Sequence, residues 1–446
     1  MVAPGLRVPG LRPAGGSAGR SVTGSGRRIL TGFAVLVAAV LAVGGVVVDT
    51  PGARADQVRD LEYWLNDYGF SQAWTTSRGA GVTVAVIDTG VDGTVAELSG
   101  AVVGGTDVSG LGSSDGQTPV GAENEHGTLV ASLLAGRGTP AGGGLIGVAP
   151  AASILSVSVA FGTSDAELSN DDQIAEAIRW AVDNGADVIN MSLTRNTLDW
   201  PTSWDDAFMY AFENDVVVVA AAGNRGSGTT EVGAPATIPG VLTVAGVDRT
   251  KEASFDASSQ GITIAVAAPS EKLVGVAPGG GYLQWDGTSA AAPIVSGLVA
   301  LVRSAYPKLD AAEVINRVIE TANPNGHTVP SPIYGNGLID AAAAVSAYVP
   351  KPTTATPAEL LQAWITLHRR ADTAPVTPTE PSTMAPVVPD ADPALPERDT
   401  AAAWLPSPLT LTYVSLPLAV LIGFGILVTL FGIGATRHFK RIRSKL

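Results

Sequence analysis

The sequence contains no cysteine and is poor in histidine and in basic residues. Without cysteine the chain can form no disulfide, thiolate nucleophile, cysteine-ligated zinc site or iron–sulfur cluster, and cysteine usage gives no indication of its compartment. Basic side chains number 27 against 41 acidic ones, and this net charge of −14 argues against a nucleic-acid partner. The 446 residues are 46% hydrophobic, which excludes disorder for most of the chain and fits one large domain with appendages.

The charges are unevenly distributed along the chain. Residues 1–28 carry five arginines and residues 436–446 carry five basic side chains, and neither segment contains an acid. Between them, residues 56–435 hold 16 basic and 40 acidic side chains, a net charge of −24. A strongly acidic body therefore lies between two basic ends.

An apolar run follows the first basic end. Residues 29–48 are apolar apart from Thr31, and an A-x-A sequence ends at Ala55. This order is typical of a secretory signal, so we predict that residues 1–55 are a signal peptide. Because the apolar run is long for a signal, an uncleaved anchor is the alternative.

A second apolar run precedes the basic tail. Residues 413–435 carry no charge and are long enough to cross ~30 Å of hydrocarbon as a helix. A buried core helix is the alternative, but the proline-rich stretch before the run and the basic tail after it favour a single transmembrane helix. Because basic residues concentrate on the cytoplasmic side, we predict a cytoplasmic tail at 436–446 and a type I cell-membrane protein with its body outside.

Between residues 82 and 347, short β-branched runs alternate with helical patterns. Residues 171–184 carry apolar side chains at every fourth position before Gly185, and residues 203–214 are similar, so both predict helices. The strand-like runs are Val82–Ile87, Ile154–Val159, Val188–Met191, Val216–Ala221, Val241–Val244 and Ile262–Ala267. This alternation predicts an α/β domain with a mostly parallel sheet between helices. Residues 100–124 are rich in glycine and serine and read as a long loop that could cover a cleft or bind a partner.

Two segments flank this predicted domain. Residues 56–81 are too few for an independent domain, and we expect an extension with a helical turn or two that packs on the body. Residues 348–412 contain 12 of the 30 prolines and predict an extended linker. Residues 357–370 interrupt the linker either as a short amphipathic helix or, the reading we favour, as a partly ordered patch.

Two polar residues stand at the ends of predicted elements. Asp88 ends a buried strand in the sequence VIDTG, and catalytic groups of parallel sheets gather at carboxyl ends of strands. Of the four histidines, only His126, in EHGT, lies at an element boundary inside the domain. Taken alone, each residue has a structural explanation, since an aspartate before glycine often forms a turn.

A serine and an asparagine complete the set. Ser289, in GTSAAAP, opens an almost uncharged helix, whose first N–H groups favour developing negative charge. An N-cap role is the alternative for this serine. Asn224 follows the VVVV strand and brings a side-chain amide to the carboxyl ends, although a turn role is as plausible for it alone. Nucleophile, base and orienting acid together are what acyl transfer requires.

Six segments in this order resemble subtilisin-like serine proteases over residues 60–347. They are VAVIDTGVD, EHGTLVASLLAG, GVAPAASILSVSV, VINMSL, VVVAAAGN and DGTSAAAPIVSGLVAL. The resemblance implies a three-layer subtilisin-like fold for the peptidase domain, 82–347. It also implies that Asp88 orients the ring of His126, that His126 is general base and then acid, and that Ser289 is the nucleophile. Asn224 and the Ser289 N–H would form the oxyanion hole.

The resemblance also locates a substrate groove. In subtilisins the segment after VINM pairs with the extended substrate backbone, which implies that Ser192, Leu193 and Thr194 line the groove here. Thr194 and Arg195 stand where secreted subtilisins have two glycines, so we expect a restricted groove and narrow specificity. No cofactor or metal ligand set is implied, although isolated loop carboxylates leave a structural Ca²⁺ open.

The layout of the whole chain resembles the mycosins, membrane-anchored subtilases of type VII (ESX) secretion systems. This resemblance implies protein substrates and a role in stabilising the secretion membrane complex, while the acidic charge balance already argues against a nucleic-acid partner. The chain departs from the family in lacking cysteine, since mycosins commonly carry disulfides. The alternatives are a mainly structural subunit whose proteolysis is dispensable, and a general cell-surface subtilase.

Overall fold

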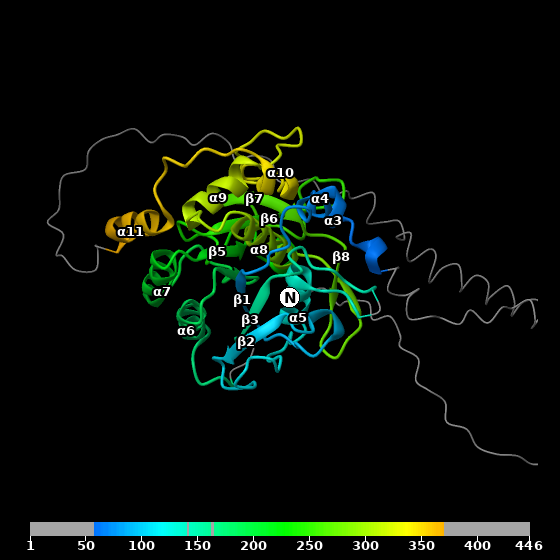
Figure 1. Cartoon of the computed structure of the whole chain (residues 1–446). Helices are drawn as coiled ribbons and strands as arrows, with labels where there is room; N and C mark the ends of the chain where they lie inside the picture. Colours follow the sequence, from blue (N-terminus) through cyan, green and yellow to red (C-terminus); the bar gives the residue numbers. More distant parts are fainter. Residues whose placement is uncertain (1–57, 141, 162–164, 370–446) are drawn as a thin grey trace, which may run out of the picture. The chain divides into compact units, whose positions relative to one another are not determined.

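The computed structural model of the chain describes residues 58–140, 142–161 and 165–369 (Figure 1). The chain divides into two units, Met1–Pro393 and Ala394–Leu446, and every described residue belongs to the first. The predicted signal peptide, transmembrane helix and basic tail lie outside the described residues and stay predictions.

A seven-stranded parallel sheet forms the centre of the described domain. Its strands run in the order β2-β3-β1-β4-β5-β6-β7, and β8 pairs with β9 in a separate antiparallel hairpin. The strands are β1 (Thr83–Asp88), β2 (Val102–Asp107), β3 (Ser153–Ser158), β4 (Val188–Met191), β5 (Val217–Ala221), β6 (Leu242–Val247), β7 (Ile264–Pro269), β8 (Leu273–Val276) and β9 (Tyr282–Trp285). Inner strands such as β5, VVVAA, are continuous apolar runs because helices cover both faces of the sheet.

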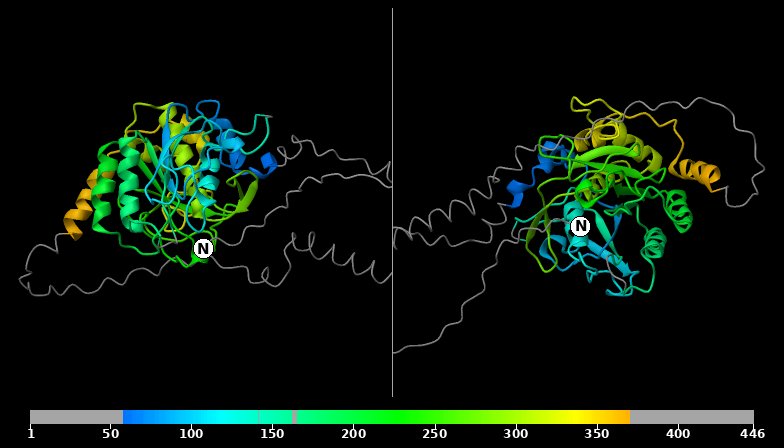
Figure 2. Two further views of the ribbon diagram at one scale, coloured as in Figure 1. Left: turned by 90° about the horizontal axis from the view of Figure 1, so that it is seen from below. Right: turned by 180° about the vertical axis from the view of Figure 1, so that it is seen from behind.

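Helices cover the two faces of this sheet (Figure 2). α5 packs with α8 on one face, and α6 packs with α7 on the other. The helices are α3 (Trp64–Asp67), α4 (Phe70–Ala73), α5 (His126–Ala135), α6 (Asn170–Asp183), α7 (Thr202–Glu213), α8 (Thr288–Ala305), α9 (Ala311–Glu320), α10 (Ala341–Ser346) and α11 (Pro357–His368), with short 3₁₀ turns at Ala96–Leu98 and Arg225–Ser227. The predicted α/β domain with a mostly parallel sheet between helices is confirmed.

Three strands escaped the sequence patterns. Residues 100–124, which we read as a loop, contain β2, and the hairpin of β8 and β9 was not predicted either. β2 reads VVGGTD and is only half-buried at the edge of the sheet. It therefore has neither the apolar run of a central strand nor the alternation of a one-sided one.

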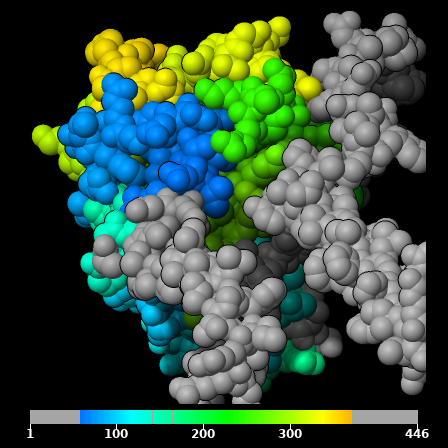
Figure 3. Space-filling view, turned by 90° about the vertical axis from the view of Figure 1, so that its right-hand side faces the viewer, coloured from blue at the N-terminus to red at the C-terminus, as the bar shows by residue number. Residues whose placement is uncertain are grey.

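The extension before β1 packs into the core of the domain. Trp64 and Phe70, on its two short helices, are fully buried among core side chains. Tyr63 Oη donates to the carbonyl oxygen of Glu271 at 2.8 Å. In the space-filling view the extension is the blue part of the surface and lies beside green residues of the later chain (Figure 3). Packing and hydrogen bonds thus hold this segment in a chain that has no cysteine.

Part of the predicted linker is folded, which corrects our reading of residues 357–370. We favoured a partly ordered patch there, but α11 forms over Pro357–His368 and packs on α7, with Leu361 fully buried. A capping box between Thr356 and Glu359, with proline at the first helical position, starts the helix. Its apolar side has a partner on the domain, which composition does not reveal.

One helix of the described residues, α8, is long and apolar enough to cross a membrane. However, 78% of it is buried in the domain, and it contacts β4, β5, β6 and β7. It is therefore the central core helix of the domain.

Candidate active site

The predicted site residues gather at one edge of the sheet. Asp88 ends β1, and Ser192 follows β4, the neighbouring strand. In the sheet, β3 and β2 lie beyond β1 on one side, and β5, β6 and β7 lie beyond β4 on the other, and ligands of open parallel sheets bind at such a switch point. His126 begins α5 and Ser289 lies in the first turn of α8, so two helix starts supply the other side chains.

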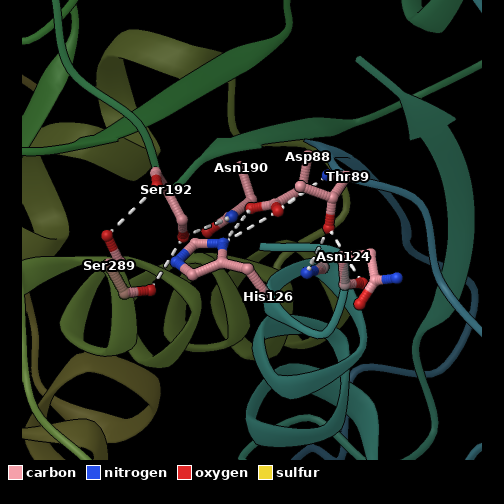
Figure 4. Close-up of polar contacts among 8 residues, drawn as sticks. Asp88, Thr89, Asn124, His126, Asn190, Ser192 and Ser289 are labelled. Carbon is pink, nitrogen blue, oxygen red and sulfur yellow. Dashed lines mark hydrogen bonds and ion pairs between the residues drawn. The ribbon is translucent and has the colours of Figure 1, made fainter. Parts of the chain in front are cut away.

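Asp88 and His126 are in direct contact (Figure 4). His126 Nδ1 lies 2.8 Å from Asp88 Oδ1 and 3.0 Å from Asp88 Oδ2, so the carboxylate accepts the Nδ1–H. The backbone N–H of Thr89 also donates to Asp88 Oδ1 at 2.8 Å, which holds the carboxylate in place. With the proton on Nδ1, the neutral ring keeps Nε2 as its basic nitrogen.

The surroundings of His126 favour its protonated form. Burial lowers the pKa of His126, but the charges of Asp88, Glu123 and Glu125 outweigh burial and hold that pKa above its usual value. The ring also meets Trp285 edge to face, with the ring centroids 5.4 Å apart. The imidazole is thus fixed in orientation and accepts a proton readily near neutral pH.

Ser289 and Ser192 exchange two hydrogen bonds. Ser192 Oγ donates to the Ser289 carbonyl at 2.8 Å, and Ser289 Oγ donates to the Ser192 carbonyl at 3.1 Å. Within the described part of the chain, no hydrogen bond joins Ser289 Oγ to His126. Catalytic hydrogen bonds are often long or poorly aligned before substrate binds, so this geometry is compatible with a Ser289–His126 hydrogen bond in a substrate complex.

A buried relay supports Ser192, and motif reasoning missed it. Asn190 Nδ2 donates to Ser192 Oγ at 3.0 Å, and Ser296 Oγ donates to Asn190 Oδ1 at 2.8 Å. Both relay residues are fully buried. The signal that could have found them is an asparagine in the middle of the apolar strand VINM, because buried polar groups need partners.

Asn224 stands opposite the start of α8. The N–H and the hydroxyl of Thr288 donate to Asn224 Oδ1 at 2.8 and 2.9 Å, which directs Nδ2 to the other side. A Cβ on Gly287 would lie 2.9 Å from Asn224 Nδ2, and Gly287 has φ 140°, which other residues rarely adopt. Glycine before Thr288 therefore makes room for this amide.

The predicted groove residues continue past β4. Thr194 Oγ1 lies against Gly233, where a Cβ would collide with it. Arg195 pairs with Asp171 and lies over the ring of Trp204, 5.5 Å from its centroid. The threonine thus fills space beside the predicted groove, whereas the arginine pairs with Asp171 of α6.

No group of three or more histidine, aspartate or glutamate side chains within residues 58–369, leaving aside 141 and 162–164, is arranged to hold a metal ion.

Comparisons with known proteins agree with this geometry. Residues 79–337 match the subtilase family model, Peptidase_S8. The chain is 39% identical to subtilisin DY of Bacillus licheniformis over 272 residues, which cover 60% of this chain and 92% of that protein.

Among solved structures, the chain is similar to the MycP3 protease of the type VII (ESX-3) secretion system. The identity is 35%, the TM-score is 0.55, and the match covers 64% of this chain and 88% of that one. MycP1 from Mycobacterium smegmatis matches with 30% identity and a TM-score of 0.55, over 66% of this chain and 86% of that one. The chain therefore belongs to the subtilase family, as a subtilisin-like serine endopeptidase similar to the mycosins MycP1 and MycP3.

Proposed function

We propose that this endopeptidase works through Asp88, His126 and Ser289. The observation that carries the proposal is the hydrogen bond from His126 Nδ1 to Asp88, at 2.8 Å, beside the start of α8 where Ser289 lies. His126 Nε2 takes the proton of Ser289 Oγ as that oxygen attacks the peptide carbonyl, and Asp88 stabilises the imidazolium that forms. The imidazolium then protonates the leaving amine, and water releases the acyl group by the reverse route.

We assign the oxyanion hole to Asn224 Nδ2 and the Ser289 N–H. Thr288 directs Nδ2 away from itself by occupying Oδ1, and the N–H groups of the first helical turn have no partner within the helix. In a subtilisin, loss of such an asparagine lowers kcat roughly 10²–10³-fold, and we expect a similar loss for Asn224→Ala.

The same proposal places the enzyme outside the cytoplasmic membrane, anchored by residues 413–435 and serving a type VII secretion complex. MycP1 and MycP3, to which the chain is similar, belong to such systems. The threonine against Gly233 supports narrow specificity, because it takes space beside the groove that Ser192, Leu193 and Thr194 line. The enzyme would process a few secreted proteins and stabilise the complex.

Complementation of a deletion strain separates the two roles. Wild-type chain and Ser289→Ala are expressed at equal levels, and both substrate processing and type VII export are measured. We expect Ser289→Ala to abolish processing, while export that continues with this variant would assign the export role to the protein as a structural subunit. Unchanged processing by Ser289→Ala would refute the catalytic assignment.

A further inference from the structure

The segment 356–369, which we call the strap, folds back onto the loop that leaves the substrate groove. Trp364 of α11 stacks on Trp200, with ring centroids 4.2 Å apart and planes inclined by 34°. Arg369 Nε donates to Asp205 Oδ2 at 2.8 Å, and Arg369 Nη2 donates to the Trp200 carbonyl at 3.0 Å. Its guanidinium also lies over both indoles, 5.8 Å from Trp200 and 5.1 Å from Trp364.

The ion pair matters because Asp205 is buried. Its side chain is only 5% exposed, and Trp200 Nε1 donates to Asp205 Oδ1 at 2.7 Å. A buried carboxylate that loses its cation must hydrate or move, and this one would take its Trp200 hydrogen bond with it. Arg369 therefore contacts Trp200 in two ways. It donates to the Trp200 carbonyl directly, and it pairs with Asp205, which accepts from Trp200 Nε1.

Trp200 ends the segment that begins in the groove, residues 194–200, which we call the groove wall. The Arg195 N–H donates to the Ala234 carbonyl at 2.8 Å, and the Ala234 N–H donates back to the Thr197 carbonyl at 2.8 Å. The start of the groove wall is thus hydrogen-bonded to Ala234. Its last residue, Trp200, is held by Trp364 and Arg369 of the strap.

We propose that Trp364 and Arg369 are positioning residues that hold the groove wall for extended substrates. The inference rests on the proposed function, in which Ser192, Leu193 and Thr194 pair with the substrate backbone. Loss of the strap contacts makes the groove wall more mobile and weakens the binding of peptides that lie in the groove. The contacts of Asp88, His126 and Ser289 do not change.

The test compares Arg369→Ala and Trp364→Ala with Leu367→Ala in the full-length chain. Leu367 is a matched control because it lies on the same helix and is 76% exposed. In the two strap variants we expect the rate of amide hydrogen exchange at Arg195 and Ala234 to rise about ten-fold, while the exchange rates of β4 stay unchanged. For an extended peptide we expect KM to rise roughly five-fold with kcat nearly constant, and Trp364→Phe to restore most of the affinity.

Unchanged exchange and unchanged KM in both strap variants would overturn the proposal. Faster exchange throughout the sheet would also overturn it, because the strap would then only stabilise the fold. A wild-type chain that cleaves no peptide would refute the proposed function instead, while the exchange measurement would still report on the strap itself.

Discussion

Ser192 Oγ donates to the Ser289 carbonyl oxygen at 2.8 Å, an acceptor that a regular helix would already use. The carbonyl of Ser289, in the first turn of α8, would ordinarily accept the N–H four residues on. That residue is Pro293, which has no N–H. The proline thus leaves the carbonyl to Ser192, and the position of Ser289 becomes tied to β4.

Ser192→Ala tests this connection. The substitution leaves the Ser289 carbonyl and the Asn190 amide without their partner, at a cost of about 1–3 kcal/mol. Because the backbone of the groove remains, we expect kcat to fall roughly ten-fold with little change in KM. Ser346→Ala is the control, since Ser346 also donates to a backbone carbonyl but lies exposed on α10. A lower free energy of unfolding with unchanged kcat would show that Ser192 contributes to stability but not to the position of Ser289 in catalysis.

Pro293→Ala should separate stability from activity. Alanine supplies the missing N–H and suits a helix interior better than proline, so the free energy of unfolding should be unchanged or higher. The new N–H competes with Ser192 for the Ser289 carbonyl, so kcat should fall several-fold. The measurements are denaturant unfolding and steady-state kinetics on the same preparation. Equal kcat in wild type and Pro293→Ala would show that catalysis does not depend on leaving the Ser289 carbonyl free for Ser192.

The acid limb of the kcat/KM profile should report the raised pKa of His126. This residue must be neutral to accept a proton, and Asp88, Glu123 and Glu125 hold its pKa above the usual 6.5 against the effect of burial. Glu125→Gln removes one of these charges, so the limb should move to lower pH by less than about one unit, with the plateau of kcat unchanged. Glu176→Gln, an exposed change on α6, is the control. A shift toward higher pH would contradict this electrostatic account.

Glu62 should make stability depend on pH. Burial raises the pKa of Glu62 to about 8, against the opposing Ile146 N–H and Arg59. The folded chain therefore holds this proton more tightly than the unfolded one, and the stabilisation present below about pH 4.5 is lost as pH rises to about 8. Glu62→Gln keeps an acceptor for the Ile146 N–H, so its free energy of unfolding should depend less on pH than that of wild type. The stability of the variant relative to wild type should be greatest at pH 8.

Unfolding by denaturant at pH 5 and pH 8 measures this difference. Glu320→Gln serves as the control because Glu320 is exposed on α9. The same decline with pH in wild type and Glu62→Gln would assign the pH dependence to other groups.

Much of this molecule could be predicted from local sequence patterns. The inner strands are apolar runs, and the motifs around Asp88, His126 and Ser289 place each residue at the end of an element, where the structure also has it. Such features depend on residues that are neighbours in the sequence, and a short sequence pattern therefore predicts them.

The features that escaped prediction depend on distant residues. The relay from Ser296 to Asn190 joins residues 106 positions apart, and the contact of Arg369 with Asp205 spans 164. α11 was underestimated because its apolar side is buried only when the domain is folded, and β2 because two glycines dilute its pattern. Tertiary contacts, not local propensity, decide these elements.

We assign Ser289 as the nucleophile, activated by His126. The most direct measurement is mass spectrometry of the folded full-length chain after reaction with a serine-reactive phosphonate. We predict a single covalent adduct on the peptide that contains Ser289, absent in Ser289→Ala and formed far more slowly in His126→Ala. A folded wild-type chain that stays unlabelled, or that carries the adduct on another residue, would contradict the account.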